Sequence, residues 1–140
     1  MKLCHLAPIA WTLPLLLASC GGSPDTTDKI SADLKAEIAA AGSALDSVHD
    51  EPSAKAAVPQ LVAVKEHITA LAERYQKLPN RTLETDVKLT QQADADTGEL
   101  NSKMLHAVMN NPKAAEIVGP AFTDISEALA RIHFTKMTVK

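Results

Sequence analysis

The chain has 140 residues, of which 46% are hydrophobic and 22% are charged, and its formal net charge is −3. This composition is typical of one small globular domain and excludes a disordered or collagen-like chain. Aromatic residues make up only 3% of the sequence, so it has neither the basic surface nor the aromatic platform that nucleic-acid binding requires. We therefore expect no nucleic-acid partner.

Residues 1–19 have the features of a removable secretion signal. Lys2 supplies a positive charge, and residues 3–17 are apolar except for His5 and Thr12. About 15 apolar residues are too few for a transmembrane helix, which needs roughly 20, but they match the hydrophobic region of a signal peptide. No later apolar run reaches the length of a transmembrane helix either.

Residues 17–20, Leu-Ala-Ser-Cys, are followed by two glycines and resemble the lipobox of bacterial lipoproteins. In that class the cysteine receives diacylglycerol on its sulfur and becomes the first mature residue, which makes Cys20 the expected lipidation site. The resemblance implies an envelope protein anchored to a membrane through Cys20. Because Gly21 rather than aspartate follows, it also implies the outer membrane, facing the periplasm, in a host with two membranes. An ordinary secretory signal with an incidental cysteine is the alternative.

Lipidation would also account for both cysteines of the chain. Cys4 would leave with the signal and the sulfur of Cys20 would be a thioether, so we expect no disulfide. Residues 20–28 are small and polar, and we expect them to form a flexible tether between the lipid and the domain.

The remaining sequence predicts an all-α domain over residues 29–134, followed by a tail at 135–140. No segment alternates apolar and polar residues as a strand would. Short connections favour antiparallel neighbours, hence a three- to four-helix up-and-down antiparallel bundle. The first helix is expected over 29–48 with Asp28 as its N-cap. Its apolar stripe consists of Ile30, Leu34, Ile38, Ala41, Leu45 and Val48.

The second helix has the clearest pattern. Asp50 precedes Glu51 and Pro52 as an N-cap precedes first-turn residues. Pro59 predicts either a kink near Lys55 or a helix that begins only at Pro59. A seam with a period of 3.5 residues is formed by Ala57, Leu61, Val64, Ile68, Leu71, Tyr75 and Leu78.

The third helix is expected over about residues 82–109, after a turn at 78–81. Its middle is polar and contains Gly98, which predicts either a loose region or the close approach of a neighbouring helix. Its apolar face is expected to consist of Leu83, Val87, Leu100, Met104 and Val108.

A break at Asn111 and Pro112 begins the last part of the domain. We expect a short helical turn over 112–118, a second break at Gly119 and Pro120, and a final helix. That helix would close the bundle with Phe122, Ile125, Leu129 and Ile132.

Residues 50–61 (DEPSAKAAVPQL) and 111–120 resemble segments of small, Ala-rich helical proteins of bacterial envelopes. The resemblance implies a helical domain and brings no catalytic residues with it.

The sequence offers few residues for chemistry. No two of the mature histidines, His49, His67, His106 and His133, are spaced to share one helical face as zinc ligands. An EF-hand calcium loop starting at Asp94 would need glycine sixth and glutamate twelfth, whereas Gly98 is fifth and Leu105 is twelfth. Nucleophile, phosphate-loop and dinucleotide motifs are absent. We therefore expect no metal, no cofactor and no enzymatic activity.

The leading hypothesis is a non-enzymatic envelope lipoprotein whose bundle binds another envelope protein or acts as a structural element. Met104, Leu105 and Met109 could form an adaptable patch for such a partner, or could fill gaps in the core. Two alternatives are a carrier of a small apolar ligand between the helices, and an immunity or inhibitor protein that neutralises a toxin.

Overall fold

The computed structural model describes residues 25–79 and 81–133, which form four helices and, within these ranges, no strand. The all-α bundle predicted from the sequence is therefore confirmed. None of the described helices is long and apolar enough to cross a membrane. Cys20, the signal residues before it and the tail at 135–140 lie outside the described residues. The helices are α1 (Thr27–Asp46), α2 (Glu51–Gln76), α3 (Leu83–Asn110) and α4 (Pro112–His133).

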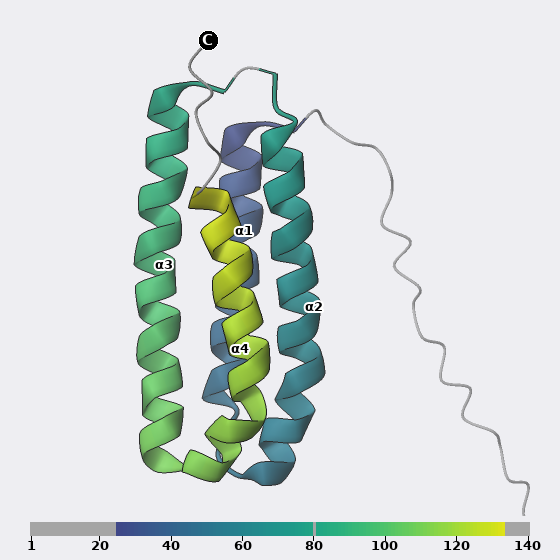
Figure 1. Ribbon diagram of the computed structural model, residues 1–140, viewed down its shortest axis with the longest axis vertical. Coiled ribbons are helices and arrows are strands. Elements are labelled where there is room, and N and C mark those ends of the chain that lie inside the picture. Colours follow the sequence, from purple (N-terminus) through teal and green to yellow (C-terminus); the bar gives the residue numbers. More distant parts are fainter. Residues whose placement is uncertain (1–24, 80, 134–140) are drawn as a thin grey trace, which may run out of the picture.

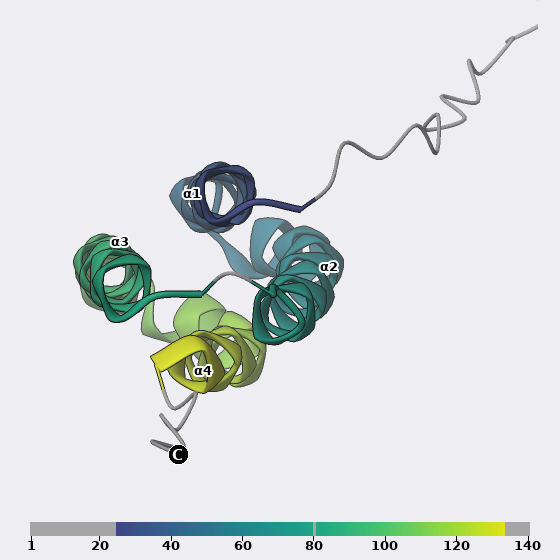
Figure 2. The same ribbon diagram turned by 90° about the horizontal axis from the view of Figure 1, so that it is seen from above.

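The helices alternate in direction along the chain (Figure 1). Seen along the bundle axis, they occupy four corners in the order α1, α2, α4, α3 (Figure 2). The connection from α2 to α3 crosses one end of the bundle diagonally. As a result α1 is antiparallel to α2 and α3 to α4, as expected, but the adjacent pairs α1/α3 and α2/α4 are parallel. Helices that follow one another along the chain are antiparallel, as the up-and-down prediction required, and the diagonal crossing adds the two parallel neighbours.

One hydrophobic core runs between the four helices. Every residue of the stripe predicted for the first helix is buried, and so is the seam of the second helix as far as Tyr75. Leu78 follows the end of α2 and is half-buried against the core. From α4, Ile125, Leu129 and Ile132 are buried as predicted, and Phe122 is half-buried.

Helix α1 begins earlier than the sequence suggested. Its N-cap is Thr26, not Asp28, because Thr26 has extended backbone angles and its hydroxyl accepts a hydrogen bond of 3.2 Å from the Lys29 amide. Asp28 lies in the first turn instead, where a negative charge favours the helix dipole. Residues 25–28, expected to be tether, thus belong to the folded domain.

Two prolines lie inside helices without ending them. Helix α2 starts at the predicted N-cap Asp50, which makes a capping box with Ser53, and continues through Pro59. A start at Pro59 is therefore wrong. Likewise α4 is a single helix through Gly119 and Pro120, where a break was expected. Each proline is exposed, so the carbonyl that loses its helical partner can be solvated.

Helix α3 is continuous across the polar middle of its sequence, but its core face differs from the expected one. Of the predicted residues, Leu100 is buried and Met104 is half-buried, whereas Leu83, Val87 and Val108 are exposed. The face that meets the core is narrow and contains two alanines. It consists of Leu89, Ala93, Leu100 and Ala107.

Candidate functional site

The outer face of α3 is the most distinctive surface of the described domain. Six large hydrophobic residues are exposed in residues 25–79 and 81–133, and five of them belong to α3. Leu83, Leu105 and Met109 are 60%, 59% and 75% exposed. We call these three residues, together with Val87 and Val108, the α3 stripe. The sixth residue, Val62, lies on α2, at the opposite corner of the bundle.

Local hydrogen bonds define the start and the end of α3, and side-chain contacts to α1 and α2 fix its rotation in the bundle. Thr82 and Thr85 form a capping box at the start, and the amide of Asn111 donates a hydrogen bond of 2.9 Å to the Ala107 carbonyl at the end. Asn111 also begins α4, since its side-chain oxygen accepts a hydrogen bond of 3.1 Å from the Ala114 amide. At about 100° per residue, the stripe is centred about 130° around the helix from the buried seam.

For Met104, Leu105 and Met109 the sequence allowed two interpretations, a patch for a partner or gap-filling in the core, and each applies to some of these residues. Met104 is packed against the core, as a gap-filling residue would be. Leu105 and Met109 instead point away from it and are largely exposed. The patch that the sequence suggested therefore exists without Met104, and Val108 joins it. Sequence reasoning assigned Val108 to the core, because position 108 continues the spacing from Leu100 and Met104.

A groove between α1 and α3 is a second candidate site. It encloses about 260 Å³, and its apolar floor includes Ile38 and Leu100. Asp96 lies in its wall, and one carboxylate oxygen of Asp96 is buried without a hydrogen-bond partner. Across the same pair of helices Lys103 forms an ion pair with Asp46. Its stem passes over Gly42, where a Cβ atom would lie 3.2 Å from the Lys103 side chain.

A polar cluster holds the diagonal connection at one end of the bundle. The Tyr75 hydroxyl donates a hydrogen bond to Asp86, and Arg81 donates two more, of 3.1 and 2.8 Å. The Arg81 guanidinium also lies 4.5 Å from the centre of the Tyr75 ring. Burial, together with Asp86, raises the pKa of Tyr75 to about 12. The hydrogen bond from Arg81 lowers the pKa of Asp86.

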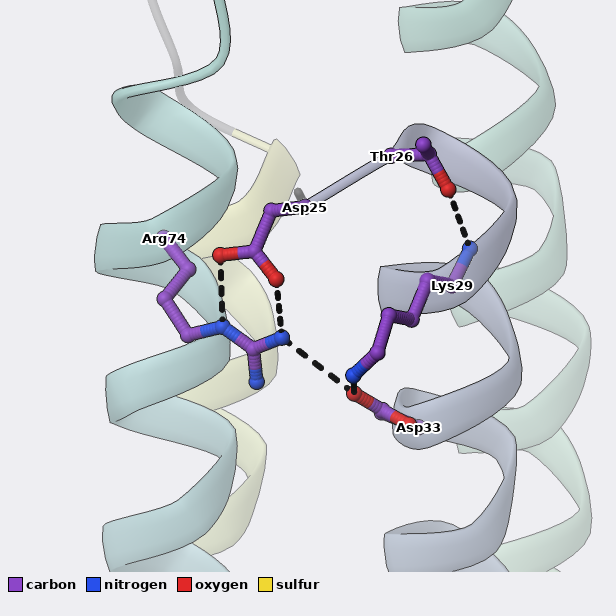
Figure 3. A network of polar contacts seen from close by, with 5 residues as sticks. All are labelled: Asp25, Thr26, Lys29, Asp33 and Arg74. Carbon is purple, nitrogen blue, oxygen red and sulfur yellow. Dashed lines mark hydrogen bonds and ion pairs between the residues drawn. The ribbon is translucent and has the colours of Figure 1, made fainter. Parts of the chain in front are cut away.

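At the same end, Arg74 of α2 fixes the start of α1 (Figure 3). Its guanidinium donates two hydrogen bonds to Asp25, one of them 3.0 Å long, and a further contact of 3.4 Å reaches Asp33. Lys29 also contacts Asp33, at 3.5 Å. The bond from Arg74 lowers the pKa of Asp25. This network orients the chain where it enters the bundle.

The histidines are not brought together. His67 lies 3.1 Å from Glu37, His49 contacts the Ser47 carbonyl oxygen, and His106 contacts Asn110. The last of them, His133, ends α4, and its side chain lies outside the described residues. Within the described part of the chain, no three His, Cys, Asp or Glu residues form a group that could hold a metal ion. The acidic stretch 94–99 is helical and forms no loop.

Comparison of the chain with protein-family models, curated proteins and solved structures gives no match.

Proposed function

We propose that this protein is a lipid-anchored envelope protein without enzymatic activity, whose bundle binds a protein partner through the α3 stripe. The observation that carries the proposal is the concentration of exposed large hydrophobic residues on one helix. Isolated exposed apolar residues are common, but several aligned along one face are typical of an interaction site. A protein partner would cover them and remove their apolar surface from water.

The lipid anchor is supported by the resemblance of residues 17–20 to a lipobox, and the contacts of Asp25 determine which end of the bundle it would hold. Residues 20–24 could span at most about 17 Å between Cys20 and Asp25. Asp25 is held by Arg74 at the end of the bundle where α1 and α3 begin. The proposed anchor would therefore keep that end of the bundle, with Leu83 and Val87 of the α3 stripe, close to the membrane.

The partner proposal is tested by photo-cross-linking in membranes of the producing bacterium. A photoreactive amino acid replaces Leu105 in the full chain, and a matched control replaces Glu66, an exposed residue of α2. We expect discrete protein adducts from position 105 and none of them from position 66. Equal, diffuse labelling from both positions would contradict a binding surface on α3.

The anchor is tested separately by intact mass and membrane partition of the full chain beside the Cys20→Ser variant. We expect a lipid-sized mass increase and membrane association, both absent in the variant. A soluble, unmodified product from the unaltered chain would overturn the anchor and leave the binding surface to be judged by the cross-linking.

The groove between α1 and α3 favours one alternative, the carriage of a small ligand. The buried, unpartnered oxygen of Asp96 and the charged walls suit a ligand with a hydrogen-bond donor better than the apolar ligand suggested by the sequence. Native mass spectrometry of the purified protein beside Asp96→Ala tests this alternative. A co-purified molecule that the substitution removes would support it.

A further inference from the structure

Eight exposed residues form a row along the outer face of α3, and both their spacing and their chemical type are symmetric about the middle of the helix. Counting from either end, the spacing of its residues is 4, 4, 3, 4, 3, 4 and 4 positions, and their order is two apolar residues, an amide, two central residues, an amide and two apolar residues. All eight residues are exposed. The row, which shares four members with the α3 stripe, consists of Leu83, Val87, Gln91, Asp94, Gly98, Asn101, Leu105 and Met109.

We propose that the protein bound by the α3 stripe is a second copy of this chain, with the two α3 helices packed antiparallel about a two-fold axis near residue 96. This inference rests on the proposed function and names its partner. A two-fold interface requires a surface that is complementary to itself. Antiparallel pairing of the row supplies four matched pairs: Leu83 with Met109, Val87 with Leu105, Gln91 with Asn101, and Asp94 with Gly98.

The centre of the row distinguishes the antiparallel arrangement from a parallel one. In a parallel pair, Asp94 would face Asp94 of the second copy directly, and like charges placed opposite one another repel. In the antiparallel pair it faces Gly98, where no atom beyond the adjacent residues and the neighbouring backbone of α3 lies within 4 Å of a Cβ position. The two Asp94 residues are then offset by about 6 Å along the axis. Antiparallel helix dipoles also attract one another.

The size of the row predicts a weak dimer. From residue 83 to residue 109 the helix rises about 39 Å, so a strip about 10 Å wide covers on the order of 400 Å² per copy. Stable interfaces bury about 800 Å² per partner, and smaller ones are typical of transient association. In the antiparallel pair the anchored ends of the two copies lie at opposite ends of the paired α3 helices, so both anchors reach one membrane only when α3 lies along its surface. In that orientation anchoring raises the effective concentration of the two copies and compensates for the small area.

The test identifies the cross-linked peptides in the experiment with the probe at Leu105. Antiparallel pairing predicts an adduct of two copies joined between position 105 and the segment around Val87. Within a single copy these positions are about 27 Å apart along α3, so that adduct must join two molecules. A link from 105 to the segment around 105 of the second copy would show a parallel pair and overturn the proposal.

Paired variants separate the interface from general effects on folding. With the probe at Val87, Leu105→Asp is expected to lower the yield of the 87–105 adduct by more than about tenfold, because a charge enters the interface twice. The matched control Val62→Asp, on the exposed part of α2, should leave the yield unchanged. Asp94→Asn should raise the yield about twofold by removing the central repulsion.

The outcomes also separate this inference from the proposed function. Adducts from position 105 that contain a different protein and never a second copy would overturn the dimer and retain the binding surface. Absence of any specific adduct would overturn both. A reduction by Val62→Asp as large as that by Leu105→Asp would also count against the dimer, because the loss would not depend on α3.

Discussion

Helices α2 and α3 have similar lengths, 26 and 28 residues, but their relation to the core differs. Helix α2 buries eight residues, among them Leu61, Ile68 and Tyr75, and its single exposed large hydrophobic residue is Val62. Helix α3 buries four residues, two of them alanines, and exposes five large hydrophobic residues. The apolar residues of α2 therefore serve the fold, whereas most of those of α3 do not contribute to the core.

This difference shows that apolar content and core contribution can be separated within one small bundle. Small residues at Ala93 and Ala107 allow α3 to approach its neighbours closely with a narrow seam. The larger side chains of the same helix then remain available on another face. If α2 supports the fold and α3 the association, substitutions on the two helices should have effects of different kinds.

The largest expected effect contrasts a leucine of each helix. Leu61→Ala removes a fully buried side chain and should lower the free energy of unfolding by about 2–5 kcal/mol. Leu105→Ala removes an exposed one and should change it by less than about 0.5 kcal/mol. Urea unfolding followed by circular dichroism measures both values. A similar loss in the two variants would mean that the stripe is part of the core after all.

The next effect concerns the polar cluster that joins the two helices across the diagonal. Asp86→Asn weakens the bonds from Tyr75 and Arg81 and should cost about 1–2 kcal/mol at pH 7, since these groups are mostly but not fully buried. Urea unfolding measures the loss. Asp124→Asn, on the exposed part of α4, is the control and should have little effect.

The same cluster predicts a pH dependence. The pKa of Asp86 in the folded chain is lower than its ordinary value of 3.8, mainly because of Arg81. Its contribution is therefore present above pH 3.8 and is lost as the pH falls through the lower, folded value. The stability difference between the unaltered chain and Asp86→Asn should shrink from pH 7 to pH 3. A difference that stayed constant over this range would show that the carboxylate charge is not what stabilises the connection.

The smallest expected effect is a gain in stability within α3. Gly98→Ala introduces a methyl group into open space and should raise the free energy of unfolding by about 0.5–1 kcal/mol, because alanine favours the helix. The matched variant Gly119→Ala also meets open space but should gain less, because Pro120 follows it. Thermal unfolding compares the two variants, and an equal gain in both would argue against the effect of the proline.

Sequence patterns predicted the positions and inner faces of α1 and α2 well because their apolar spacing is regular and a single face is apolar. In α3 two apolar patterns overlap. Leu83 and Val87 continue the helical spacing no worse than Leu89 and Ala93, so spacing alone could not tell which set is buried. The continuity of α4 was missed because Gly119 and Pro120 are local breaking signals, which the burial of Val118 and Ala121 outweighs.

The sequence by itself determined the helical class of the domain, the N-cap at Asp50 and the inner faces of α1 and α2. These features depend on neighbouring residues and on the period of a helix, both of which can be read along one segment. Only the tertiary structure decided the order of the helices around the bundle, the diagonal crossing held by Asp86 and the face of α3 left exposed. Those features depend on which helices pack together, and packing between distant segments follows from the fit of all four surfaces at once.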